Sequence, residues 1–375
     1  MDSGLYKTIT FVCFILIGVF LKSKIKTKDE KSGIKAIILN LALPATIFIA
    51  LLGVKVDWNL VFLPIIALAL NVVLFLATPY VLPLVGIEKG SSEFRTARLL
   101  IPSLAPGLSC FPFVLEFLGE NALAKVAMAD LGNKIFVLVI LYIVAMNWHY
   151  RYRSIVKKSN GKVLSLLKVL VSEPVNIFIA VALILLGLGF TMDTLPALFG
   201  DILTKLSLIM TPLVLLFIGL GIKLKRKQFF QVFSMLCLRA GLVLLLGGIF
   251  IILTGMQSIE NILLLLAFGL SSCSFWPYAH ISAVEHLEID DNKKRTFDSD
   301  FALNILALSF PLSTVLILGV LNTGTFFVTN INILIIGGVL FAIGLIYPVL
   351  TGLNKKISLA KVSKTKMEQT APEHI

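Results

Sequence analysis

Long apolar runs separated by short polar stretches follow one another along the whole chain. Each run has roughly the 20 residues that a helix needs to cross the hydrocarbon layer of a bilayer. The polar stretches are too short for a soluble domain, so we expect an all-α polytopic membrane protein with a single membrane domain over residues 1–375. The pattern predicts eleven helices, at 5–22, 33–54, 58–85, 95–119, 122–148, 169–190, 197–222, 229–255, 259–287, 299–321 and 331–353.

Lysine and arginine are concentrated in every second connection and in the tail at 354–375, whereas the other connections carry few charges. Because positively charged loops stay on the cytoplasmic side, this alternation predicts an extracellular N-terminus and a cytoplasmic C-terminus. The first run is followed by Lys22-Ser23-Lys24 rather than by a small-residue cleavage site. We therefore expect a retained helix, not a signal peptide, and a multi-pass protein of the cell membrane.

Composition excludes several other classes of protein. The chain is 58% hydrophobic and 14% charged, whereas a soluble domain has about 25% charged residues. The net charge of +12 lies in short loops, so it indicates membrane topology and not nucleic-acid binding. The four cysteines lack metal-ligand spacing, and the sequence has no phosphate-binding glycine loop, HExxH motif or nucleophile elbow. We expect no cofactor, no metal and no enzymatic activity.

Two of the apolar runs contain residues that break helices. They are Ile101–Pro112 and Gly269–Pro277, which lie at corresponding places in the two halves of the chain. Broken helices at matching positions indicate a transporter substrate site near the bilayer midplane. Pro112 and Pro277 suit the first turn of a second half-helix. Lipid cannot satisfy unwound backbone, so we expect a bound solute or water to help satisfy it.

The two halves also repeat motifs in the same order and at nearly constant separation. Pro44 is matched by Pro212, and Asp130 by Asp300, while Asn133 and Asn304 follow the two aspartates. Each unit holds five predicted helices, so the second unit enters the membrane from the opposite side. We therefore predict inverted repeats at 5–148 and 169–321, with 331–353 as an additional helix outside the repeat.

Polar and helix-breaking residues of the two breaks, together with three asparagines of other predicted helices, form the predicted substrate site. They are Asn40, Ser109, Cys110, Pro112, Asn133, Ser272, Cys273, Ser274, Pro277 and Asn304. Asp130 is the candidate for ion coupling, because a carboxylate within the membrane is costly; capping of the broken fourth helix is the structural alternative. Arg239 is expected to snorkel towards the membrane surface, with pairing to an anionic substrate as the alternative. The acidic residues from Glu285 to Asp291 are expected to form a solvated face rather than a metal cluster.

Two stretches of the first half resemble the auxin efflux carrier (AEC) family. They are Ile38–Phe48 and Phe111–Gly119, the latter followed by Asp130-Leu131-Gly132-Asn133. The resemblance covers residues 5–321 and is closer in the first half. It implies a scaffold, a mobile bundle, crossing broken helices four and nine, and organic anions as substrates. The chain departs from the family at Ala105, where members often carry Asn, and in its eleventh helix.

We therefore expect a secondary transporter, an AEC-type permease that moves a small organic anion across the lipid bilayer by alternating access. A cation-coupled symporter of the bile-acid:sodium type, and a membrane receptor that has lost transport, remain alternatives. Proton or sodium coupling and a homodimer are left open, and no nucleic-acid partner is expected.

The predicted topology can be tested by cysteine labelling. In a background without the four native cysteines, Asn121→Cys should react with an impermeant maleimide added outside intact cells. Asn160→Cys should react only after the membrane is opened, because the loop charges place it in the cytoplasm. Labelling of both positions from the same side would contradict the helix count and the inverted repeat.

Overall fold

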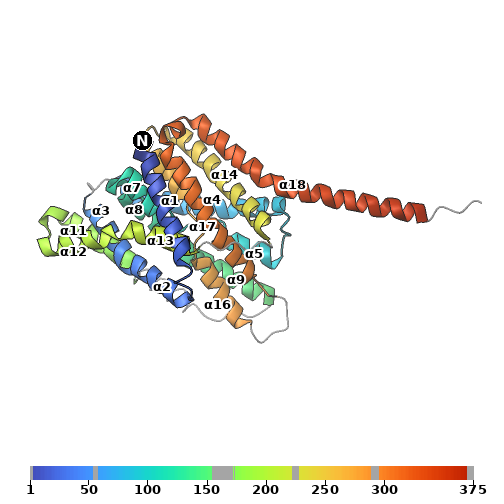
Figure 1. Cartoon of the computed structure of the whole chain (residues 1–375), viewed down its shortest axis with the longest axis horizontal. Coiled ribbons are helices and arrows are strands. Elements are labelled where there is room, and N and C mark those ends of the chain that lie inside the picture. The colour runs from blue at the N-terminus through green and yellow to red at the C-terminus, as the bar shows by residue number, and fades with distance from the viewer. Residues whose placement is uncertain are drawn as a thin grey trace, which may run out of the picture.

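The computed structural model describes residues 3–53, 58–153, 172, 174–221, 228–288 and 295–369. Within these ranges every element is helical and no strand is present (Figure 1). Seven helices are long and apolar enough to cross a membrane, and shorter apolar helices accompany them. The predicted all-α polytopic membrane fold is confirmed. The seven spans are Asp29–Leu52, Phe62–Val85, Glu120–Tyr152, Ala197–Leu220, Phe229–Thr254, Ser299–Asn322 and Asn330–Val349.

The two halves contain helical elements in a similar order. The first half consists of α1 (Ser3–Leu21), α2 (Lys28–Ile37), η1 (Ile38–Ala42), α3 (Leu43–Leu52), α4 (Trp58–Val81), η2 (Leu82–Val85), α5 (Ser92–Leu100), α6 (Pro106–Ser109), α7 (Phe111–Leu118), α8 (Glu120–Ile135), η3 (Phe136–Ile140) and α9 (Leu141–Arg153). The second consists of α11 (Pro174–Gly187), η4 (Met192–Thr194), α12 (Ala197–Leu208), α13 (Met210–Gly221), α14 (Phe229–Thr254), α15 (Ile259–Gly269), α16 (Trp276–Leu287) and α17 (Ser299–Asn322). The chain then continues through η6 (Gly324–Val328) into α18 (Asn330–Gln369).

Several predicted helix boundaries differ from the structure by a few residues or more, and two of the differences have a clear cause. The second helix begins at Lys28, because Thr27 and Glu30 form a capping box that starts the helix before its apolar part. Helix α18 continues to Gln369, well beyond the predicted end at 353. Residues 354–369 are rich in lysine and other good helix formers and contain no proline, so nothing in the sequence ends the helix there.

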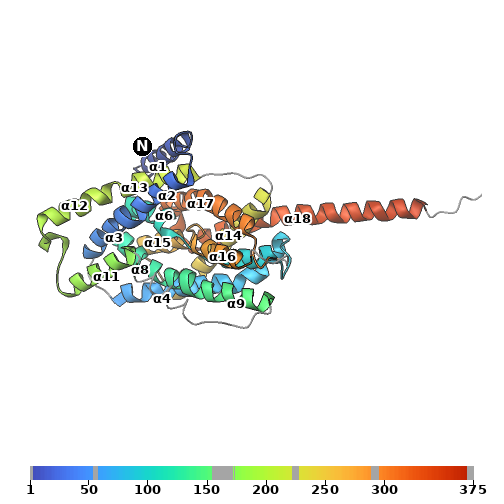
Figure 2. The ribbon, with the colours of Figure 1, turned by 90° about the horizontal axis from the view of Figure 1, so that it is seen from below.

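The helices form two groups, which we call the scaffold layer and the bundle layer. The scaffold layer consists of α1, α2, η1, α3, α11, α12 and α13, and occupies the upper and left-hand part of Figure 2. The bundle layer consists of the remaining helices, with α18 packed along α14. Within the scaffold layer, α1 packs on α13, and α11 packs on α3. The first helix of each half therefore contacts the second helix of the other half, as two related units would. The inverted orientation of the second unit stays a prediction.

Glycines allow helices to approach each other closely within both layers. A Cβ atom on Gly219 of α13 would lie 2.1 Å from the Ile15 carbonyl oxygen of α1. A Cβ atom on Gly132 of α8 would lie 1.8 Å from the Pro64 carbonyl oxygen of α4. Lipid offers no hydrophobic driving force between helices, so close packing of small residues is a principal source of their association. These two contacts fix α1 on α13 and α4 on α8.

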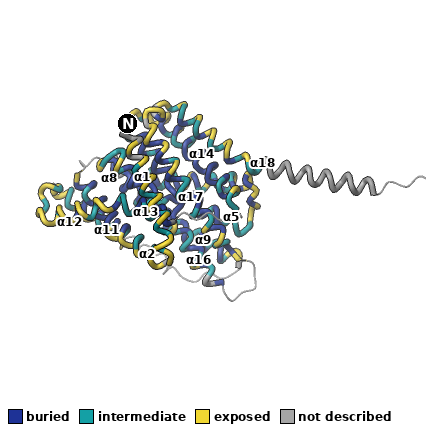
Figure 3. The backbone as a smooth tube through the Cα atoms, in the orientation of Figure 1, coloured by how far each residue is buried: buried dark blue, intermediate teal, exposed yellow. Residues whose placement is uncertain are grey.

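Many large apolar residues are exposed. Buried residues lie where the helices meet, and exposed residues lie towards the outside (Figure 3). Leu253 of α14 is 80% exposed and Val315 of α17 is 66% exposed. Exposed apolar surface on this scale is expected where lipid rather than water surrounds the protein.

Candidate functional site

Both predicted breaks are present in the structure. Helix α5 ends at Leu100, residues 101–105 are not helical, and the chain continues through the one-turn helix α6 into α7. Helix α15 ends at Gly269, and residues 270–275 are not helical before α16 begins. Pro112 and Pro277 lie in the first turns of α7 and α16, where the missing N–H group breaks no helical hydrogen bond.

The two breaks are hydrogen-bonded to each other. The Ala105 N–H donates to the Ser272 carbonyl oxygen at 2.8 Å, and the Ser272 N–H donates to Ser109 Oγ at 2.9 Å. The Ser274 N–H donates to Ser103 Oγ at 3.0 Å. Residues far apart in the sequence therefore meet in one buried polar region, which we call the crossing.

Arg239 of α14 holds the two breaks together. Its Nε donates to the Ile101 carbonyl oxygen at 2.8 Å, and its Nη2 donates to the Ser271 carbonyl oxygen at 2.8 Å and to that of Ser103 at 3.3 Å. The residue is 5% exposed, so the expectation that it snorkels is wrong. The carbonyl groups at the C-terminal ends of α5 and α15 carry partial negative charge. The fixed fork of guanidinium donors can serve several of them at once.

Asn133 of α8 hydrogen-bonds to both backbone groups of Leu104 in the first break. Its Nδ2 donates to the Leu104 carbonyl oxygen at 2.9 Å, and its Oδ1 accepts from the Leu104 N–H at 3.2 Å. Asn71 of α4 donates to the Pro102 carbonyl oxygen at 3.1 Å and to Asn133 Oδ1 at 2.8 Å. Asn71 Oδ1 is buried and has no hydrogen-bond partner in the described part of the chain.

Asp130 is buried beside Asn133 and is accompanied by a lysine. Its Oδ1 accepts from Asn133 Nδ2 at 2.8 Å, and its Oδ2 lies 3.7 Å from Lys134 Nζ. Lys134 also donates to Asn176 of α11 at 3.0 Å, which joins the bundle layer to the scaffold layer. The carboxylate therefore supports the asparagine that binds the break, and an internal ammonium balances its charge.

The second break uses different residues from those predicted by the repeat. The Cys273 N–H donates to Ser309 Oγ at 3.3 Å, and Ser313 Oγ donates to the Leu270 carbonyl oxygen at 2.6 Å. Asn304, the predicted counterpart of Asn133, donates instead to Gln228 at 2.9 Å. Ser309 and Ser313 lie one turn apart on α17, a spacing that places both on one helix face and could have identified them.

Groups of the protein itself thus satisfy many of the unwound backbone groups that we expected a solute or water to help satisfy. Ser109, Asn133 and the main chain of Ser272, Cys273 and Ser274 build the crossing. Cys110 is buried at the start of α7, and Asn40 lies in η1 with an exposed side chain. A direct role of the ten predicted residues in substrate binding stays a prediction.

A cleft of about 380 Å³ lies between the two layers. Scaffold helices α1, α3, α12 and α13 form one side, and bundle helices α7 and α8 form the other. Its lining contains the carboxylates of Glu116 and Glu120 and no basic side chain. Four residues with hydroxyl side chains also line it: Thr10, Thr46, Ser207 and Thr211.

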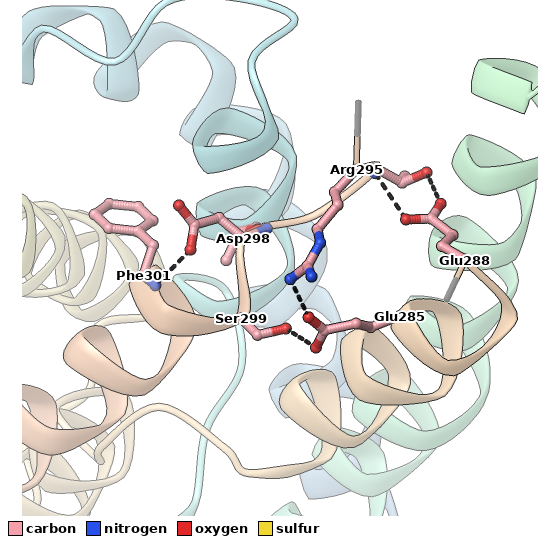
Figure 4. A network of polar contacts seen from close by, with 8 residues as sticks. Glu285, Glu288, Arg295, Asp298, Ser299 and Phe301 are labelled. Atoms are coloured by element: carbon pink, nitrogen blue, oxygen red, sulfur yellow. Dashed lines mark hydrogen bonds and ion pairs between the residues drawn. The ribbon is translucent and has the colours of Figure 1, made fainter. Parts of the chain in front are cut away.

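A separate polar network ties the end of α16 to the start of α17 (Figure 4), and His149 joins it from α9. Glu288 is 8% exposed, and its carboxylate lies 2.9 Å from His149 Nδ1 and accepts from the Thr296 N–H at 3.1 Å. Glu285 pairs with Arg295 and accepts from Ser299. The expectation of a solvated face is therefore wrong for Glu288, because a buried histidine faces it. Asp290 and Asp291 lie outside the described residues. Among the residues that the structure describes, no group of side chains could hold a metal ion.

Comparison with known proteins gives one informative relative. The chain matches no known family model. It is 27% identical over 223 residues to an uncharacterized transporter of Methanocaldococcus jannaschii, a match that covers 57% of this chain and 68% of the relative. Together with the apolar helices, this similarity supports a multi-pass membrane protein of transporter type.

The role of Arg239 predicts a graded loss of stability. Arg239→Gln leaves buried carbonyl groups without donors, at a cost of about 1–3 kcal/mol for each unsatisfied group, so its melting temperature in detergent should fall sharply. Arg239→Lys keeps the charge but loses the forked set of guanidinium donors. Its melting temperature should lie between those of Arg239→Gln and the native protein. The exposed Arg295→Gln is the matched control and should change the melting temperature little. Equal melting of all three variants would refute the assignment.

Proposed function

We propose that this chain is a secondary transporter of the AEC type, which moves a small organic anion across the cell membrane by alternating access. The observation that carries the proposal is the crossing: two broken helices hydrogen-bonded to each other within the bundle layer, in a protein that also has a cleft between its two layers. Irregular backbone at membrane depth is tolerated only where protein buries it or where it lines a water-filled cavity. Such a feature is typical of transporter substrate sites.

The charge of the crossing favours an anion. Arg239 bonds to neutral carbonyl groups, whereas Asp130 is accompanied by Lys134. The charges of these three side chains therefore sum to one positive charge in a region of low dielectric, where charge interactions are strong. The starts of α7 and α16 lie beside the same region, and helix N-termini attract anions. This agrees with the organic anions that the resemblance implies.

Alternating access requires the two layers to move against each other. The crossing lies within the bundle layer, and the cleft separates α7 and α8 from the scaffold helices. We propose that the bundle layer rocks as a unit, which closes this cleft and opens the opposite face. In this proposal the N-terminus lies outside and the C-terminus in the cytoplasm, as the loop charges predict.

The internal cations weigh against a sodium symporter. A sodium ion bound at such a crossing would use backbone carbonyl groups as ligands, and Arg239 already donates to those of Ile101, Ser103 and Ser271. We propose transport without sodium and leave Asp130 as the candidate for proton coupling. Ala105 does not abolish the crossing, because its main-chain N–H supplies the contact with Ser272.

Uptake by proteoliposomes tests the proposed function. The purified chain should take up at least one labelled anion from a panel of malate, lactate and indole-3-acetate, and replacement of sodium by choline should leave the rate unchanged. Ser207→Trp fills the cleft and should strongly reduce uptake, whereas Lys205→Trp, exposed on the same helix, should not. Sodium-dependent uptake would favour the symporter. Binding of an anion without uptake would favour the receptor.

A double substitution tests whether Asp130 acts in transport. Asp130→Asn alone leaves Lys134 buried without its carboxylate, which costs about 3–5 kcal/mol for a broken buried pair, so we expect a lower melting temperature. Asp130→Asn combined with Lys134→Met removes both charges. This double variant should regain most of the melting temperature lost in Asp130→Asn. If Asp130 relays a proton, the restored double variant should transport poorly and lose the pH dependence of uptake. Native uptake across the pH range in this variant would assign Asp130 a structural role alone.

A further inference from the structure

A lysine of the scaffold layer rests on an aromatic ring at the second break. Lys35 lies in the last turn of α2 and is half-buried. Its Nζ lies 4.4 Å from the centroid of the Phe275 ring. Phe275 directly precedes α16 and follows the unwound residues 271–274, and the Tyr278 ring packs against it at a centroid distance of 5.2 Å. This contact crosses the boundary between the two layers.

The ring does not neutralise the lysine. A cation over an aromatic face is attracted by the ring quadrupole, but the ring carries no net charge. Within the described residues no carboxylate forms an ion pair with Lys35. Phe275 is itself 49% exposed. Lys35 therefore places a positive charge beside the crossing, at the boundary between the two layers, and no carboxylate of the described residues pairs with it.

The cleft between the layers has the opposite charge. Thr46, which lines it, follows Lys35 along the continuous helix α2–η1–α3 at an axial distance of about 16 Å. The two carboxylates of Glu116 and Glu120 face this cleft. Between the two ends, Leu43 packs on Gly107 of α6, where an added Cβ atom would lie 3.2 Å from Leu43 Cδ2. One scaffold helix thus carries the basic residue Lys35 on one side of this contact and lines the acidic cleft on the other.

We propose that Lys35 binds the carboxylate of the transported anion at the face predicted to be cytoplasmic, and that Glu116 and Glu120 make the opposite cleft a site of release. When the bundle layer moves, Phe275 leaves Lys35, and the anion takes its place. An ammonium–carboxylate contact is a strong, charge-assisted hydrogen bond, whereas the two glutamates repel an anion in the cleft. The site therefore has higher affinity at the Lys35 face. This inference rests on the proposed function.

Membrane vesicles of both orientations, prepared with the full chain, test the inference with labelled malate as the probe. The half-saturation concentration should be lower at the Lys35 face than at the cleft face. Lys35→Gln should raise the ratio of the two values, Lys35 face over cleft face, about tenfold, the usual effect of losing a hydrogen bond to a charged group. Lys35→Arg should keep the native ratio. Lys26→Gln, an exposed lysine at the same end, is the matched control and should leave the ratio unchanged.

The glutamates supply an independent readout. Glu116→Gln combined with Glu120→Gln should lower the half-saturation concentration at the cleft face, because the repulsion is removed. A ratio near one in the native chain, or no response to Lys35→Gln, would overturn the inference. The inference would also be overturned if putrescine competed with malate in the native chain but not in the double glutamine variant. The cleft would then be a cation site.

Failure of the proposed function gives a different result. If vesicles of neither orientation take up malate, transport of this anion is refuted, and calorimetric binding of malate to the purified chain then tests Lys35 alone. Loss of binding in Lys35→Gln with retention in Lys26→Gln would support the assignment. Equal affinity in the two variants, or no binding of malate to the native chain, would refute it.

Discussion

The structure depends on one constraint: backbone that leaves the helical conformation inside a membrane must find hydrogen-bond partners within the protein. Two helices are broken at the crossing, and several neighbouring helices supply the hydrogen-bond partners of their unwound backbone. Arg239 of α14 serves carbonyl groups of both breaks, and Asn133 of α8 serves both backbone groups of Leu104. Serines of α6 and α17 accept from the N–H groups of the second break. These side chains come from helices that pack around the breaks and supply the hydrogen bonds that lipid cannot.

The same constraint separates the two layers by their chemistry. The scaffold layer is held by close helix packing, as at Gly219 and Ile15, and the described part of it contains no broken helix of the crossing kind. The bundle layer carries the polar network. The named contacts between the layers are of three kinds: the amide–ammonium bond of Asn176 and Lys134, the apolar packing of Leu43 on Gly107, and the ring contact of Lys35. The proposed movement of the bundle layer would change these contacts and leave the crossing intact.

The sequence was sufficient to predict the helical membrane fold, the two breaks and the placement of Pro112 and Pro277, because prolines and serines in apolar runs are local signals. It was not sufficient to predict the partners of the breaks. Arg239 looks like a snorkelling residue until α14 is placed against both breaks, which lie at large sequence separations from it. Glu288 looks solvated until His149 is placed beside it. Ser309 and Ser313 were missed because Asn304 kept the spacing of the repeat while the contacts moved along α17.

The position of Arg239 in the chain has a consequence for biosynthesis. Ribosomes make the first break, then α14, and only afterwards the second break. When α14 enters the membrane, Arg239 has the carbonyl groups of Ile101 and Ser103 available, but Ser271 has not yet been made. Insertion of an arginine at the centre of a helix is unfavourable by itself. The first break therefore supplies the hydrogen-bond partners that are available to Arg239 when α14 is made, and the second break adds the last one afterwards.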